Sequence, residues 1–357
     1  MQVRSAESRR RVVRGPAGHP LDATSPAPLR SRRGRGRRPP PRLRRRERPP
    51  GRPRPLGRKA PAGVARARCD GGDRFASVRD EALLFSELDG LLSAGAPDFA
   101  IVAVPTEEHV SAVSALAAEG VNVLVEKPLA ATAAEGRELE AAGRVAGRLV
   151  QVGHIFRFHP VTATLREALG AGRIGRVRYA TGRFAGFKRP RADGGVTQAD
   201  AIHYFDLFAH LFDRDATRVD AIQRDYLGRG LDDLSWTVVH YGDIPVSVEA
   251  NYFVPGNWRE CVIVGEHGAL VADFNGDAVS VHLGEHRRHG DAWEAVETGK
   301  EELPVNGEEP LRLELSAFLD ACAGKAPNLA PAAVGVRALD VVEAAAQSAR
   351  LGRSVIL

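Results

Sequence analysis

Two residues far apart in the sequence, Lys127 and His203, have side chains that can move protons near neutral pH. Lys127 follows the apolar run VNVLV at 121–125, and His203 lies in DAIHYFD between Asp200 and Asp206. An imidazole with an unperturbed pKa of ~6.5 suits general acid–base catalysis, and a neighbouring carboxylate would orient the ring and stabilise its protonated form. Both aspartates lie three residues from the histidine, so a helix would place the three side chains on roughly one face. The alternative is a helix-face histidine that caps a helix or fills a core.

The segment 97–129 is typical of a strand, a helix and a second strand joined in one βαβ unit. Thr106 can cap the intervening helix, and two glutamates follow in its first turn, where negative charge is favourable. Pro128 cannot donate to a ladder, so the second strand is predicted to run through Lys127 and to end there. Because ligands bind beyond the carboxyl ends of strands in an open parallel sheet, Lys127 should stand at the edge of a binding crevice.

The remainder of the chain predicts a second part with a different architecture. After residue 150, a long strand and an apolar-faced helix are followed by short apolar runs at hairpin spacing, which is typical of an open, mostly antiparallel sheet. We therefore expect an α/β protein with a partial doubly wound (Rossmann-type) parallel-sheet domain over 71–150 and a C-terminal α+β domain over 151–357. The individual predictions are a helix capped near Ser86, a helix over 129–148 with a capping box of Thr132 and Glu135, strands over 148–158 and 174–187, a helix over 201–212, and helices at about 308–323 and 331–350.

Residues 1–70 differ in composition from everything that follows. They contain 12 of the 23 prolines and 22 Lys and Arg against 4 Asp and Glu, whereas the remaining 287 residues carry 28 basic and 41 acidic side chains. Such a segment cannot bury enough apolar surface to offset the entropy of ordering, so we predict that it is disordered. A polybasic arm that binds nucleic acid is one interpretation, and out-of-frame translation of GC-rich DNA is the alternative that we favour.

Four motifs of the remaining chain carry a family resemblance. They are VAVPTEEH (102–109), EKP (126–128), GHIFRFHP (153–160) and DAIHYFD (200–206). From about residue 71 onward, the chain resembles the glucose-fructose oxidoreductase, inositol dehydrogenase and MocA (Gfo/Idh/MocA) family of NAD(P)-dependent sugar dehydrogenases. The resemblance implies a preceding strand, GxGxxG turn and helix that would bind a pyrophosphate. That turn is not found in residues 1–70, where Gly34 and Gly36 stand among arginines with no strand before them.

The resemblance also implies a catalytic set and a cofactor. It implies that His203 and Lys127 act together on a substrate hydroxyl, with Lys127 holding or sharing the proton, and that NAD or NADP is bound. Asp200 is the third catalytic candidate, although many members place the acid four residues before the histidine, where this chain has Ala199. Cofactor contacts fall on Val104, Pro105, Thr106, His109, Glu126, Lys127 and Arg157. For Arg157 and His154, a structural hydrogen bond on a strand is the alternative.

The basic stretch GRFAGFKRPRADGG at 182–195 supplies candidates for substrate binding. Arg183, Lys188 and Arg189 suit phosphate oxygens, which favours a nucleotide-diphosphate sugar as the substrate. The stretch is similar to that of family members that oxidise the 3-hydroxyl of UDP-N-acetylhexosamines. A solvated basic loop is the alternative.

No metal site is expected from the histidines or cysteines. His282, His286 and His289 lie together, but no carboxylate or cysteine completes a ligand set, so a polar hairpin loop is the better interpretation. The three cysteines are far apart and lack CxxC spacing, which indicates free thiols.

These predictions favour an NAD(P)-dependent oxidoreductase that removes hydride from a secondary hydroxyl of a sugar or nucleotide sugar. The alternative is a non-catalytic remnant or binding protein that lacks the phosphate-binding half-domain. No apolar run approaches the ~18 residues of a membrane span, so we expect a cytoplasmic protein. An exposed face of the antiparallel sheet makes a homo-oligomer the expected assembly. A nucleic-acid partner is not expected.

Overall fold

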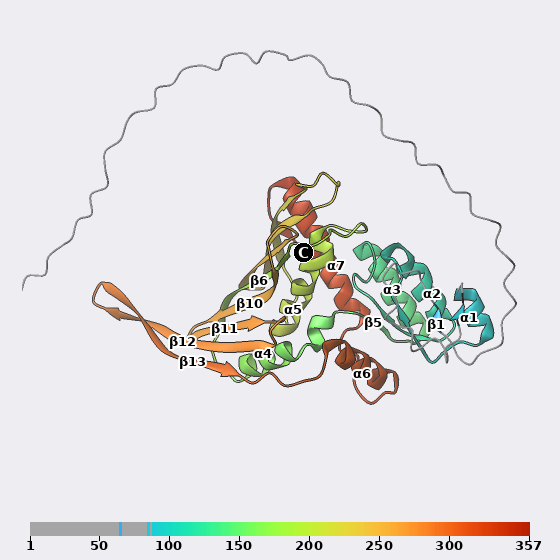
Figure 1. Cartoon of the computed structure of the whole chain (residues 1–357), viewed down its shortest axis with the longest axis horizontal. Helices are drawn as coiled ribbons and strands as arrows, with labels where there is room; N and C mark the ends of the chain where they lie inside the picture. The colour runs from blue at the N-terminus through green and yellow to red at the C-terminus, as the bar shows by residue number, and fades with distance from the viewer. Residues whose placement is uncertain (1–63, 66–83, 86–87) are drawn as a thin grey trace, which may run out of the picture. The chain divides into compact units, whose positions relative to one another are not determined.

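A computed structural model describes residues 64–65, 84–85 and 88–357 of the chain (Figure 1). The predictions for the basic segment, for Cys69 and for a helix cap near Ser86 lie outside these residues, except that Val64–Ala65 form the short strand β1. Within the described ranges, no helix combines the length and the apolar character needed to cross a membrane.

The first part of the described chain is a small parallel α/β unit. Its elements are β2 (Leu84–Phe85), α1 (Leu88–Ala94), β3 (Phe99–Val102), the 3₁₀ turn η2 (Thr106–Glu108), α2 (His109–Ala118), β4 (Asn122–Val125), α3 (Ala133–Ala146) and β5 (Val150–Val152). The order β3-β4-β5 makes a parallel sheet, and β1 pairs with β2 in parallel. The βαβ prediction is therefore confirmed for β3, α2 and β4.

Two details at the strand ends differ from the predictions. β4 ends at Val125 rather than at Lys127, because the last ladder bonds are donated by Glu126 N to Val102 O and by Gly153 N to Val125 O, and bends follow from residue 127. Thr106 does not cap α2: it lies inside η2, whose N-cap is a proline, and no side-chain capping bond forms. By contrast, the predicted capping box at the start of α3 is present in both directions.

The second part is built on a nine-stranded mixed sheet. Its elements are the 3₁₀ turn η3 (Ile155–Phe158), α4 (Pro160–Gly170), β6 (Val177–Gly186), the π-helix η4 (Thr197–Ala201), α5 (Ile202–Phe212), β7 (Arg218–Arg224), β8 (Leu234–Tyr241), β9 (Ile244–Asn251), β10 (Asn257–Gly265), β11 (Gly268–Asp273), β12 (Ala278–His289), β13 (Ala292–Leu303), α6 (Pro310–Cys322), α7 (Ala332–Leu351) and β14 (Val355–Ile356). The strand order is β13-β12-β11-β10-β6-β9-β8-β7-β14, and only β6 and β9 run parallel. These two parts confirm the predicted fold class.

Helices α4, α5 and α7 cover one face of the large sheet and form its core with the inward side chains of the strands (Figure 1). α7 also packs against α3, so one helix joins the hydrophobic cores of the two sheets. The predicted strand over 148–158 is shorter than expected, because the chain leaves β5 at Val152 and winds into η3.

Tyr204 fixes α5 against the centre of the sheet. The ring is fully buried, and its hydroxyl donates to the carbonyl oxygens of Arg183 on β6 (3.0 Å) and Glu260 on β10 (2.8 Å). A Cβ on Gly182 would lie 2.6 Å from Tyr204 Cδ1, so only glycine permits this close approach. α5, which carries His203, is therefore held in a defined position on the sheet.

The hairpin β12–β13 extends beyond the rest of the sheet (Figure 1). β11 pairs with β12 only as far as Leu283, and from Gly284 to His289 β12 pairs with β13 alone. The loop predicted around residues 282–289 is therefore a strand, and the hairpin turns only after His289. Residues 285–289 of β12 are all polar or charged and exposed, which allows this extension because both faces of the ribbon meet solvent.

Candidate functional site

Lys127 reaches from the small parallel sheet to η4, the turn that precedes α5 and His203. Its Nζ donates to the carbonyl oxygen of Ala199 at 2.5 Å. Burial lowers the pKa of the Lys127 ammonium from its ordinary 10.5 to about 8, and the carboxylate of Asp200 opposes this shift. The side chain is therefore able to exist as a neutral amine near physiological pH.

A π-helical segment, η4, leads into α5 and presents that carbonyl. Its first residue, Thr197, donates from its backbone N (2.8 Å) and its Oγ1 (2.6 Å) to Oδ2 of Asp232. A Cβ on Gly195 would lie 1.7 Å from Oδ1 of Asp232, so a glycine is required where this carboxylate meets the chain. π-Helical turns inside helices are frequent at functional sites, because the wider winding changes which groups face outward.

His203 packs against two neighbouring aromatic rings, whose centroids lie 6.3 Å from each other. Its imidazole stacks on Phe156 (centroids 5.1 Å apart) and on Phe184 (5.4 Å, with the rings 7° from parallel). Burial, followed by the nearby charge of Lys127, lowers the pKa of His203 well below its usual value. Its Nδ1 is buried and has no hydrogen-bond partner among the described residues. The ring is therefore neutral at pH 7 and free to accept or donate a hydrogen bond.

The two aspartates flanking His203 do not make the expected contact with its ring. Asp200 instead accepts a hydrogen bond from Lys188 Nζ through Oδ1 at 3.0 Å; its Oδ2 lies 2.8 Å from the same Nζ as an ion pair but has no hydrogen-bond partner among the described residues. Asp206 pairs with Arg157. The expectation assumed a regular α-helix across 200–206, but the π-helical winding of η4 rotates Asp200 relative to the residues that follow. A carboxylate that orients His203 is therefore not part of the described site.

Arg157 lies at the junction of the two parts and is fully engaged there. Its guanidinium forms a bidentate pair with Asp206 (2.7–2.9 Å), and Nη1 donates to the carbonyl oxygen of Leu329 at 3.1 Å. The exposed fractions of the two paired side chains are only 8% and 2%. This is the structural role that the sequence left open, here on the turn after β5 rather than on a strand.

His154 is a residue whose role the sequence left undecided. It follows β5 directly and is 1% exposed, yet neither of its ring nitrogens has a hydrogen-bond partner among the described residues. Because Gly153 N bonds to Val125 O, His154 emerges beside the end of β4 and hence near Lys127. The structural hydrogen bond considered for it is not formed. The sequence did contain a signal for His154 as a site residue, because it follows a buried strand directly and so lies at the carboxyl edge of the sheet.

The predicted cofactor residues gather at the carboxyl ends of β3 and β4. Val104, Pro105 and Thr106 follow β3, and Glu126 is exposed at the end of β4. The ring of His109 is buried and lies within 3.2 Å of carbonyl oxygens from both loops, those of Val104, Pro128 and Leu129. The His109 ring therefore links the loop that follows β3 to the loop that follows β4.

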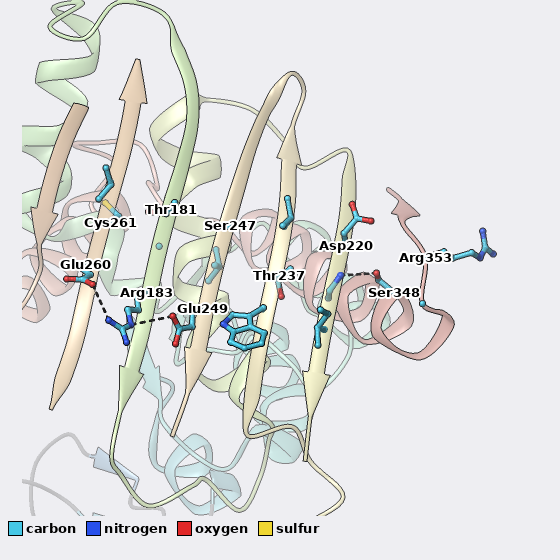
Figure 2. A pocket seen from close by; sticks show the side chains of 18 of the residues that line it. Thr181, Arg183, Asp220, Thr237, Ser247, Glu249, Glu260, Cys261, Ser348 and Arg353 are labelled. Carbon is cyan, nitrogen blue, oxygen red and sulfur yellow. Dashed lines mark hydrogen bonds and ion pairs between the residues drawn. The ribbon is translucent and has the colours of Figure 1, made fainter. Parts of the chain in front are cut away.

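The predicted substrate residues are not all brought to this site. Arg183 lies on the opposite face of the large sheet, because alternation along β6 sends Phe184 toward His203 and its neighbour outward. There its guanidinium pairs with Glu249 (3.4 Å) and Glu260 (3.7 Å), in a groove of about 720 Å³ (Figure 2). Lys188 does reach the site, through Asp200, whereas Arg189 is exposed on the following loop.

The histidines of the long hairpin do not gather. His282 shares a hydrogen bond with Ser280 (3.0 Å), and His289 lies 3.4 Å from Glu294 near the tip. Among the described residues, no group of three or more His, Cys, Asp or Glu side chains could hold a metal ion.

A parallel Rossmann-type unit followed by a domain with a large mixed sheet is the architecture of two-domain, dinucleotide-dependent oxidoreductases. A family model described as an oxidoreductase family with an NAD-binding Rossmann fold matches residues 63–154, and the model of that family's C-terminal alpha/beta domain matches residues 166–357. The chain belongs to this Gfo/Idh/MocA family of oxidoreductases.

Relatives and solved structures agree with this assignment. Inositol 2-dehydrogenase 1 of Saccharopolyspora erythraea is 29% identical over 271 residues, which cover 70% of this chain and 73% of the relative. The rhizopine catabolism protein MocA of Rhizobium meliloti is 30% identical over 276 residues, which cover 72% and 77%. The structure of UDP-N-acetylglucosamine 3-dehydrogenase GnnA from Acidithiobacillus ferrooxidans matches with a TM-score of 0.67 at 21% identity, over 81% of this chain and 90% of that one. The structural match shows the shared fold.

Proposed function

We propose that the chain is an NAD(P)-dependent dehydrogenase that oxidises a secondary hydroxyl of a sugar or nucleotide sugar. The observation that carries this proposal is the meeting of Lys127 with the turn that leads into His203, across the junction of the two parts. A lysine with a lowered pKa and a neutral imidazole with an unpartnered nitrogen are the groups that proton removal from an alcohol requires.

The residues present fit a dinucleotide at the carboxyl edge of the parallel sheet. A Cβ on Gly153 would lie 3.3 Å from Oε2 of Glu126, so the glycine allows the chain after β5 to pass close to this carboxylate. Val104, Pro105, Thr106 and Glu126 would hold the cofactor, and the bound nicotinamide would accept hydride from the carbinol carbon. Both NAD and NADP remain candidates.

Proton transfer falls to the two site residues of this chain. The neutral amine of Lys127 would accept the hydroxyl proton as the C–H bond breaks, and His203 would hydrogen-bond the same oxygen and share that proton. The aromatic rings of Phe156 and Phe184 keep the imidazole in one plane and exclude water from it. The unpartnered nitrogens of His154 offer a further hydrogen bond to the sugar.

For the substrate, we propose a UDP-N-acetylhexosamine oxidised at its 3-hydroxyl. Arg189 lies exposed on the loop that follows β6 and carries positive charge suited to a diphosphate. The structural neighbour named as a UDP-N-acetylglucosamine 3-dehydrogenase supports this choice, whereas the relative named as an inositol 2-dehydrogenase favours a free polyol. Measuring NAD(P)H formation with UDP-N-acetylglucosamine and with myo-inositol separates the two.

A cofactor titration tests the proposed function directly. Addition of NADH or NADPH to the full chain should enhance the cofactor fluorescence and saturate in the micromolar range that is usual for such enzymes. Absence of binding at millimolar cofactor would refute the proposal and leave the alternative of a non-catalytic binding protein. In an active preparation, Lys127→Ala or His203→Ala should lower kcat/KM by about 10²–10⁴-fold. His289→Ala, at the exposed hairpin tip, is the matched control and should not change it.

We also propose that a second copy of the chain covers the open face of the large sheet. The groove on this face is lined by Ile222, Trp236 and Val271, each between 37% and 51% accessible. Apolar side chains gathered on one sheet face are typical of a protein interface. Light scattering coupled to size exclusion should give a mass above the 38.4 kDa of one chain, and Trp236→Glu should return it to that value. A monomer at all concentrations would exclude this assembly.

A further inference from the structure

Lys188 is fixed beside the site by several contacts, although it lies on a loop. Its ammonium pairs with both carboxylate oxygens of Asp200, at 2.8 and 3.0 Å, and lies 4.9 Å from the ring centre of Phe184 and 5.5 Å from that of Tyr252. The Asp200 side chain is only 6% exposed, whereas that of Lys188 is 38% exposed. A solvated loop lysine would have no such set of partners. The carboxylate that the sequence assigned to His203 is thus bound by a second lysine.

Lys127 and Lys188 contact consecutive residues of the same π-helical turn. Lys127 donates to the carbonyl oxygen of Ala199, and Lys188 binds the side chain of the next residue. The free carboxylate of Asp200 would be a strong partner for the ammonium of Lys127 in this partly buried setting. An ammonium bound in that way would resist losing its proton.

We propose, on the basis of the proposed function, that Lys188 is a positioning residue that occupies Asp200 and thereby keeps this carboxylate from binding the ammonium of Lys127. Among the residues that the structure describes, the Lys127 ammonium then remains hydrogen-bonded only to the carbonyl oxygen of Ala199, and it can exchange its proton with a substrate hydroxyl. Lys188 itself need not touch the substrate.

The charges around Lys127 support this role. Burial is the main cause of its lowered pKa; Arg191 and Lys188 lower it further, whereas Asp200 and Glu126 raise it. The other titratable groups that interact with its charge are His154, His203 and Asp193. Burial lowers the pKa of both histidines, so they are neutral at pH 7, and Asp193 is paired with Arg191 at 2.6 Å. Removal of Lys188 would both delete a positive charge and release Asp200. Both changes act in the same direction, toward a higher pKa for Lys127.

Competitive labelling measures the protonation of Lys127 without any substrate. The full chain is treated with trace acetic anhydride at a series of pH values, and acetylation of Lys127 is quantified by mass spectrometry. In Lys188→Met, the labelling midpoint should rise by about one pH unit, so that labelling at pH 8 falls several-fold. Lys188→Arg should keep the wild-type midpoint. Lys300→Met is the matched control, because it removes another carboxylate-paired lysine, bonded to Glu302 at 2.9 Å on β13.

The route through Asp200 is tested in a second background. In Asp200→Asn there is no carboxylate to release, so Lys188→Met should shift the midpoint much less than in the wild type. An unchanged midpoint in Lys188→Met, or an equal shift with and without Asp200, would overturn the proposal. A shift of the same size in Lys300→Met would overturn it too.

The labelling also separates this proposal from the proposed function. A shifted Lys127 midpoint in a chain that binds no cofactor would support the role of Lys188 while excluding a dehydrogenase. Cofactor binding and turnover with no shift in the midpoint would support the dehydrogenase and exclude that role. In an active preparation, the ascending limb of kcat/KM against pH should move upward in Lys188→Met together with the labelling midpoint.

Discussion

Replacing Asp206 with Asn should destabilise the second part of the chain strongly, because it leaves the guanidinium of Arg157 buried without a counter-charge. The pair is bidentate, with distances of 2.7–2.9 Å, and almost inaccessible to solvent. Breaking one side of a buried ion pair costs about 3–5 kcal/mol. The Asn oxygen can still accept one hydrogen bond from Arg157, and Leu329 O still accepts another. We therefore expect the free energy of unfolding to fall by about 3 kcal/mol. The free energy of unfolding of a typical domain is about 5–15 kcal/mol, so this loss is a large fraction of it.

Urea unfolding followed by tryptophan fluorescence is the suitable assay. All three tryptophans, Trp236, Trp258 and Trp293, lie on strands of the large sheet, so the signal reports the part that contains Asp206. The matched control is Asp243→Asn, whose partner Arg214 is 47% exposed and whose own side chain is 65% exposed. Exposed pairs contribute about 0–1 kcal/mol, so this variant should unfold close to the wild type.

Acid unfolding gives a second reading of the same pair. Burial alone would raise the pKa of Asp206, but its interactions with the His154 imidazole and with the charge and hydrogen bonds of Arg157 outweigh it and lower the pKa below the usual 3.8. The stabilisation is therefore present above the unfolded pKa and is lost as the pH falls through the folded one. Asp206→Asn should abolish that acid-side loss. A change in unfolding free energy below about 1 kcal/mol in Asp206→Asn, or an equal change in the control, would refute the reasoning.

Three further predictions concern packing, capping and pH. Gly182→Ala should cost about 1–3 kcal/mol, because its Cβ would press on the buried ring of Tyr204, whereas Gly170→Ala, with nothing within 4 Å, should not destabilise; thermal unfolding compares them. Thr132→Ala removes the capping box of α3 and should lower the free energy of unfolding by about 1 kcal/mol, which urea unfolding measures. In the oxidation direction, kcat/KM should rise with pH through about 8, because the neutral amine of Lys127 is the base; a flat profile from pH 6 to 9 would exclude it.

Local patterns were sufficient to predict the architecture. The βαβ unit, the capping box and the antiparallel character of the second sheet follow from apolar periodicity and turn residues, which act within a few positions of the chain. Alternation along β6 also contained the information that Arg183 and Phe184 face opposite sides, although the basic composition of 182–195 suggested one common site.

The ion pairs of the site could not be predicted in the same way. Spacing of three residues places Asp200 near His203 only on a regular α-helix, and the π-helical turn depends on Asp232, which is distant in sequence. The partners of Asp200 and Asp206 come from a loop and from the turn after β5. Such contacts are set by tertiary packing, on which a single sequence carries little signal.

The two outer strands of the large sheet limit how copies of the chain can join. β13 is long, but it carries Glu294, Glu297, Glu301 and Glu302, and like charges along an unpaired strand oppose the addition of another backbone. At the opposite border, β14 offers only Val355 and Ile356, too short a template for pairing. Lateral growth into a continuous ribbon of sheets is therefore disfavoured at both borders. Stacking of one sheet upon another is the mode of association that this fold leaves open.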